Sequence, residues 1–156
     1  MKRDFVATAY IIEGKKILHV FHKKHQKWVS PGGHLDPNEL PHEGAIREAF
    51  EETGIKIRII SPNTDFITGE CAQTLPPPFT MLLEEIPEYK NIPAHQHIDF
   101  IFMAEAVEGN LSENPAETEG IGWFTLEQIE ELVREGKAFS ESLKIAESML
   151  EQLALR

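Results

Sequence analysis

The chain has 156 residues, of which 41% are hydrophobic, and its 15 basic and 26 acidic side chains give a net charge of −11. This length suits one domain, and this apolar content can form a core, which excludes general disorder. The negative charge disfavours nucleic acid as a partner, and no apolar run is long enough to span a membrane. A single cysteine, Cys71, excludes an internal disulfide and a multi-thiolate zinc site. We therefore expect a soluble, cytoplasmic protein with one domain over residues 1–156.

The first third of the chain alternates like β-strands and then becomes helical. Alternating apolar residues predict strands over residues 5–12, 17–21 and 28–30. Pro31-Gly32-Gly33 predicts a sharp turn after the third strand. A helix is predicted over residues 41–53, with a proline in its first turn and Gly54 just past its end, although Leu40 is a poor N-cap.

The rest of the chain predicts further strands followed by two helices. The expected strands cover residues 55–60, 65–71, 80–86, 98–107 and 121–124. Three consecutive prolines place residues 72–79 in a loop, because proline cannot lie in a central strand. Amphipathic helices are expected over residues 126–134 and 140–153. Strands interleaved with one central and two late helices favour an α/β fold, an α/β/α sandwich around a mixed sheet.

The central predicted helix carries a cluster of glutamates. At about 100° per residue, Glu48, Glu51 and Glu52 share an arc of about 100°. Ala45 and Ala49 lie on the neighbouring apolar face, so the three acids border the buried side of the helix. Like charges at this spacing repel one another, and a bound cation relieves the repulsion. Clustered carboxylate oxygens suit Mg²⁺ or Mn²⁺.

The residues around these glutamates add two features to the expected site. The glycines before the helix let the backbone approach a ligand closely, and a free carbonyl there would complete the coordination of a metal. Arg47 is the cation next to the acids, and its guanidinium can orient a carboxylate through a bidentate pair and hold the loop to the helix.

The stretch from Gly33 to Ile55 resembles the Nudix box, the signature of the Nudix hydrolase family, G-x5-E-x7-R-E-U-x-E-E-x-G-U, in which U is a bulky aliphatic residue. Ala49 fills the first U position and Ile55 the last. The remaining fixed positions are filled by Gly33, Glu39, Arg47, Glu48, Glu51, Glu52 and Gly54. The lead-in from Lys27 to Gly32 and the later Trp123-Phe124 also resemble Nudix surroundings.

The resemblance implies metal-dependent hydrolysis of a nucleoside diphosphate linked to another moiety, with water attacking a phosphorus atom of the diphosphate. It assigns Mg²⁺ or Mn²⁺ to the box glutamates, one of which acts as or positions the general base. The Gly32 carbonyl is implied as a further ligand. Arg47 and Glu39 are implied to stabilise the loop and helix and to orient the acids.

Seven histidines raise the question of a zinc site. His19, His22 and His25 are spaced by three residues, but they span a strand and a turn, where this spacing does not keep side chains together. His95 and His97 share one face of a strand, so a histidine metal site or a substrate contact stays an alternative to a purely structural role.

Several other residues have more than one interpretation. Glu117 or Glu119 is a candidate for the extra acid that Nudix enzymes often recruit outside the box, and a solvated acidic loop is the competing reading. We expect Cys71 in a strand or the core, Trp28 as a packing residue, and His34 facing solvent or a loop.

Two rival functions compete with hydrolysis. One is a non-catalytic Nudix domain that senses a nucleotide, although such domains usually lose box glutamates and this chain retains them all. The other is an isoprenoid diphosphate isomerase, which would need extra catalytic residues that the sequence does not single out. The expected partner is a small nucleotide-like diphosphate, its specificity set by residues 72–97, and a homodimer stays open.

Overall fold

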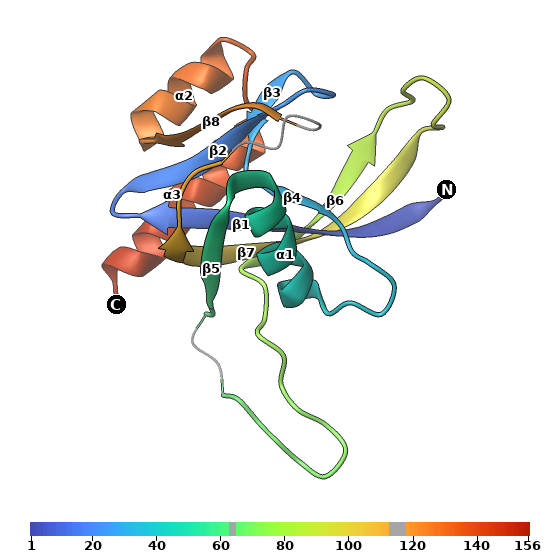
Figure 1. Cartoon of the computed structure of the whole chain (residues 1–156), viewed down its shortest axis with the longest axis vertical. Helices are drawn as coiled ribbons and strands as arrows, with labels where there is room; N and C mark the ends of the chain where they lie inside the picture. The colour runs from blue at the N-terminus through green and yellow to red at the C-terminus, as the bar shows by residue number, and fades with distance from the viewer. Residues whose placement is uncertain (63–64, 113–117) are drawn as a thin grey trace.

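The computed structural model describes residues 1–62, 65–112 and 118–156, and Figure 1 shows the arrangement of its elements. In chain order these are β1 (Arg3–Glu13), β2 (Lys16–His22), β3 (Lys27–Val29), β4 (Gly32–His34), α1 (Pro41–Thr53), β5 (Ile55–Ile60), β6 (Thr80–Ile86), β7 (His95–Gly109), β8 (Thr118–Phe124), α2 (Leu126–Arg134) and α3 (Ser140–Ala154). Among the described residues, no helix is both long and apolar enough to cross a membrane.

The strands of the described residues form one mixed sheet centred on β1 and β7. These two strands run parallel, whereas the other pairs are antiparallel. The sheet follows the order β3-β2-β1-β7-β5, with β4 beside β1, β6 beside β7 and β8 beside β2. β7 is long enough for both β6 and β5 to pair along it, β6 with residues 95–101 and β5 with residues 103–109.

Strand alternation gives the sheet two apolar faces, each covered by helix (Figure 1). On one face, Ala45 and Ala49 of α1 belong to a buried cluster with Ala7, Ala9 and Phe102. The small alanines on both sides bring α1 close to β1. The helix that carries the glutamates is therefore held against the centre of the sheet.

The opposite face of the sheet is covered by the two late helices. Ile129 of α2 and Met149 of α3 belong to a second buried cluster with Tyr10, Ile17 and Ile101 of the sheet. Helices on both faces of a mixed sheet make the α/β/α sandwich expected from the sequence, so that prediction is confirmed.

The ends of α1 follow the sequence signals. Leu40 occupies the N-cap without a side-chain cap, and Pro41 lies in the first turn, where its missing N–H costs nothing. Gly54 ends the helix in the left-handed conformation, with φ 77°. A Cβ at this position would lie 2.6 Å from the carbonyl oxygen of Asn110, so both backbone strain and close approach require glycine.

The sequence predictions were wrong at two places in the chain. Residues 65–71 form no strand: the described residues show only one bridge, between Thr68 and Gln73, and the apolar side chains of Phe66 and Ile67 are exposed. Strand propensity was insufficient because no partner strand lies beside this segment. Cys71 is accordingly exposed rather than in a strand or the core.

The second place is the pair of glycines before α1. Gly32 and Gly33 do not form a sharp turn but lie in the short strand β4, antiparallel to β1. Their small size still matters, because a Cβ on Gly32 would lie 2.6 Å from the carbonyl oxygen of Ala7. The glycines thus let β4 press against β1.

Candidate active site

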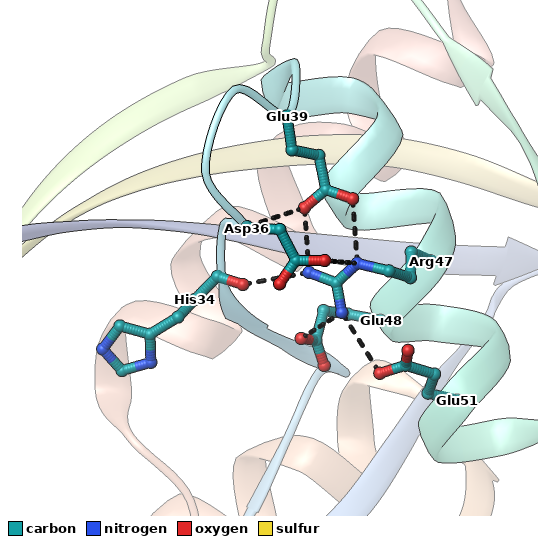
Figure 2. A network of polar contacts seen from close by, with 6 residues as sticks. All are labelled: His34, Asp36, Glu39, Arg47, Glu48 and Glu51. Carbon is teal, nitrogen blue, oxygen red and sulfur yellow. Dashed lines mark hydrogen bonds and ion pairs between the residues drawn. The ribbon is translucent and has the colours of Figure 1, made fainter.

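Arg47 connects the glutamates of α1 to the loop that precedes it (Figure 2). Its Nε and Nη2 donate to the two carboxylate oxygens of Glu39 at 2.8 and 2.9 Å, a bidentate pair. Its Nη1 donates to Glu48 at 2.8 Å and to Glu51 at 3.1 Å. Nη2 also donates to the backbone carbonyl of His34 at 3.0 Å. One guanidinium therefore contacts a strand, a loop and two positions of the helix.

This network is strongly acidic. Four carboxylates, on Asp36, Glu39, Glu48 and Glu51, lie within 4 Å of the guanidinium of Arg47. Hydrogen bonds that Arg47 donates to Glu39 hold the pKa of Glu39 below its ordinary value, and the same bonds raise the pKa of Arg47. With all groups ionised, one positive charge faces four negative ones, an excess that attracts a cation.

The three box acids of α1 differ in burial. The side chain of Glu51 is 52% exposed and that of Glu48 is 12% exposed, while Glu52 as a residue is only 2% exposed. The acids therefore border the buried face, as the helical wheel predicted. Gly33 lies against Glu48, because a Cβ there would be 2.7 Å from its carboxylate. Any larger residue at this position would displace Glu48.

The carbonyl of Gly32 faces the same side as the guanidinium of Arg47. Pro31 and Leu35 make backbone hydrogen bonds to β1. Because such bonds alternate along an antiparallel strand, the carbonyls of Gly32 and His34 point away from β1. The His34 carbonyl accepts from Arg47, so β4 presents backbone oxygen atoms toward the acidic network.

The comparison with known proteins agrees with this geometry. A family model described as the NUDIX domain matches residues 2–143. The chain belongs to the Nudix family. A Lactococcus lactis subsp. cremoris protein named as a probable DHNTP pyrophosphohydrolase is 31% identical over 133 residues, covering 85% of this chain and 69% of that protein.

Solved structures share the fold over nearly the whole chain. A Nudix-family hydrolase from Clostridium perfringens has a TM-score of 0.76 at 25% identity, covering 98% of this chain and 99% of that one. A C. elegans Ap4A hydrolase in a binary complex has a TM-score of 0.67 at 19% identity, covering 98% and 99%. The protein is thus a Nudix hydrolase with the α/β/α sandwich of its family.

Five of the seven histidines of this Nudix hydrolase fall into three groups. His19 is buried, with its ring centroid 5.7 Å from that of Phe124. His22 and His25 have ring centroids 4.6 Å apart, so the spacing by three did bring these two together, without His19. His95 and His97 share a face of β7, as expected. Burial lowers the pKa of His97 to about 4.

Three further residues were singled out by the sequence, Trp28, Glu117 and Glu119. Glu117 lies outside the described residues, and Glu119 is exposed on β8. Trp28 packs between the rings of Phe21 and Phe124, at centroid distances of 5.4 and 5.0 Å, which agrees with the packing role expected for it.

Sequence reasoning missed a pair of carboxyl groups on the α3 side of the sheet, the buried Asp99 and the half-buried Glu84. Asp99 is buried and accepts hydrogen bonds from the Thr8 hydroxyl at 2.9 and 3.0 Å. Burial and the neighbouring charge of Asp99 raise the pKa of Glu84 to about 9, and burial also raises the pKa of Asp99. The signal in the sequence was an aspartate inside the otherwise apolar run from Ile98 to Met103.

Proposed function

We propose that this Nudix hydrolase cleaves a diphosphate bond in a nucleoside diphosphate linked to another moiety, using Mg²⁺ or Mn²⁺ at the Nudix box. The observation that carries the proposal is the network in which Arg47 holds Glu39, Glu48 and Glu51 together next to the buried Glu52. A domain that only binds a nucleotide does not need four carboxylates around one guanidinium.

The donor groups at the box fit a hard divalent cation. Glu48, Glu51 and Glu52 offer carboxylate oxygens, and Gly32 offers a carbonyl on the same side of β4 as the network. Such an all-oxygen set matches the preference of Mg²⁺ and Mn²⁺. When bound, the ion would offset charge on the substrate phosphates and lower the pKa of a bound water.

The residues of the chain have distinct roles in this proposal. Glu48, Glu51 and Glu52 hold the cation, and one of them accepts the proton of the attacking water. Arg47 orients Glu48 and Glu51 through its Nη1, and it anchors the loop through Glu39. Arg47 and Glu39 are therefore positioning residues in this scheme.

The names of two relatives support this class of substrate. One is named a pyrophosphohydrolase and one an Ap4A hydrolase, and both names denote cleavage at a phosphate anhydride. Residues 65–79, which precede β6, extend from the body of the molecule (Figure 1). We assign selection among such substrates to residues 72–97, since loops outside a catalytic scaffold carry specificity.

Two substitutions test the catalytic reading. Glu48→Gln and Glu52→Gln keep side-chain size but remove a charge from the cation site. We expect each to lower kcat by two or more decades, about 3 kcal/mol of transition-state stabilisation. The measurement is phosphate release in a screen of nucleoside diphosphate derivatives with Mg²⁺ and Mn²⁺, with circular dichroism on each variant.

Glu43→Gln is the matched control, because Glu43 is exposed in the first turn of the same helix. Its kcat should equal that of the unmodified protein. Wild-type rates in both Glu48→Gln and Glu52→Gln would contradict the catalytic reading. Tight nucleotide binding without turnover by the unmodified protein would support the sensing domain instead.

A further inference from the structure

A second cluster of metal-ligating side chains lies where β1, β4 and β7 meet, apart from the Nudix glutamates. Asp4, His34 and His97 each offer a ligand atom, and these three atoms lie within 4.8 Å of one another. His95 adjoins them, with its Nε2 3.2 Å from Nε2 of His97 and 4.0 Å from Oδ2 of Asp4. We propose that the three imidazoles and one carboxylate of this cluster bind a transition-metal dication such as Zn²⁺.

The register of the sheet brings these residues together. Asp4 of β1 lies opposite His97 in the parallel pair with β7, and His34 of β4 lies opposite Val6. Because side chains alternate along a strand, His95 shares the face of His97, and Val6 shares that of Asp4. All four candidate ligands therefore project from one face of paired strands, which position ligands more rigidly than loops do.

Two of the separations between ligand atoms match a tetrahedral site. Ligand atoms about 2.0–2.1 Å from Zn²⁺ lie about 3.3 Å from one another. The separation of the two Nε2 atoms of His95 and His97 is 3.2 Å, and that between Nε2 of His34 and Oδ2 of Asp4 is 3.4 Å. The side chain of His34 is 61% exposed, so it can rotate to adjust its own distances, whereas the 4.0 Å between Nε2 of His95 and Oδ2 of Asp4 must shorten by about 0.7 Å.

The partners of the ring nitrogens leave Nε2 available as the ligand atom. Nδ1 of His95 lies 2.9 Å from the carbonyl oxygen of Pro93, to which it donates a hydrogen bond. Nδ1 of His97 faces Oε1 of Glu84 at 3.9 Å. Zinc-bound histidines usually direct their second nitrogen to a carbonyl or carboxylate in this way. Imidazole ligands also favour Zn²⁺ over Mg²⁺, which prefers oxygen.

This cluster is separate from the Nudix box but shares His34 with it. Figure 2 shows the His34 ring directed away from Arg47, while its backbone carbonyl accepts from that guanidinium. A cavity of about 350 Å³ lined by Asp4, His34 and the following loop gives access from solvent. Lys2 contacts Oδ1 of Asp4 at 3.6 Å, leaving the other oxygen for the ion.

The test is a Zn²⁺ titration of the chelator-treated full chain in excess Mg²⁺, which occupies oxygen sites and leaves imidazoles free. We expect one Zn²⁺ per chain by calorimetry, together with a rise in Tm. His34→Ala and Asp4→Asn should each weaken Zn²⁺ affinity by about tenfold or more. His34 is exposed, so its replacement leaves the fold intact, which circular dichroism verifies.

The matched control is the double variant His22→Ala/His25→Ala, which removes another adjacent pair of rings and should keep full Zn²⁺ affinity. Unchanged affinity in His34→Ala and Asp4→Asn would overturn the proposal. So would an affinity that falls in Glu48→Gln but not in His34→Ala, because the ion would then lie at the glutamates. Neither outcome depends on whether the protein hydrolyses diphosphates.

Discussion

His19 shows how strand alternation places an ionisable ring inside this molecule. The residue is fully buried on β2, and its Nε2 has no hydrogen-bond partner among the described residues. Burial lowers the pKa of His19 to about 4, partly opposed by the Ile17 carbonyl, so the ring is neutral at pH 7. In the unfolded chain the same ring returns to its ordinary pKa of about 6.5.

This shift makes stability depend on pH. Between about pH 6.5 and pH 4 the unfolded chain binds a proton that folded His19 does not, so His19 lowers stability as the pH falls. Between pH 7 and pH 5 the unmodified protein should lose about 1–2 kcal/mol more unfolding free energy than the His19→Leu variant, which lacks the ionisable ring. Urea unfolding of both proteins at both pH values measures this difference. An equal loss in the two proteins would contradict the prediction.

Arg47 acts at the scale of elements, because it joins α1 to β4 and to the loop between them. Its five hydrogen bonds reach Glu39, Glu48, Glu51 and the His34 carbonyl. The guanidinium is partly buried, so these contacts are less screened by water than an exposed ion pair. Leu35 packs the start of the loop against the core, and Arg47 holds the rest of the loop to α1 through Asp36 and Glu39.

Removing this junction should lower both stability and activity. We expect Arg47→Ala to cost about 2 kcal/mol of unfolding free energy, since several charged hydrogen bonds are lost. Arg47→Lys should be intermediate, because an ammonium cannot reproduce the bidentate fork. Urea unfolding gives the energies. Arg58→Ala, which removes an exposed cross-strand pair with Glu105, is the control and should change stability by less than about 0.5 kcal/mol.

At the scale of the whole molecule, negative charge dominates. The net charge is −11, and the Nudix box concentrates several carboxylates around one guanidinium. Such self-repulsion opposes the compact state, and a cation bound at the box offsets it locally. Stabilisation by a cation bound at a specific site saturates at a low cation concentration, whereas stabilisation by general salt screening does not.

Mg²⁺ should therefore raise Tm in a saturable manner, and a chelator should reverse the shift. At a concentration of about 100 times Kd, binding contributes about 2.7 kcal/mol. The effect should weaken toward pH 5, because protons compete for the same carboxylates. Thermal unfolding with Mg²⁺ and with NaCl at equal ionic strength checks this. Equal shifts from the two salts would show screening alone.

The local pattern of the sequence was sufficient for the helices and for the acidic arc. Pro41 and Gly54 set the ends of α1, because one residue tolerates the missing donor and the other a positive φ. The 3.6-residue period placed Glu48 and Glu52 beside the buried face. These features depend on neighbours within a few residues, so they can be read from sequence.

Tertiary structure decided what depends on distant partners. Phe66 and Ile67 lie in a sequence typical of a strand, but among the described residues no strand pairs with them and their side chains are exposed. Gly32 lies in a strand because β1 is beside it. The meeting of Asp4 with His97 required the parallel pairing of β1 and β7, more than ninety residues apart in the chain. Sheet register is set by contacts across the whole core, and no local window of the sequence contains both partners.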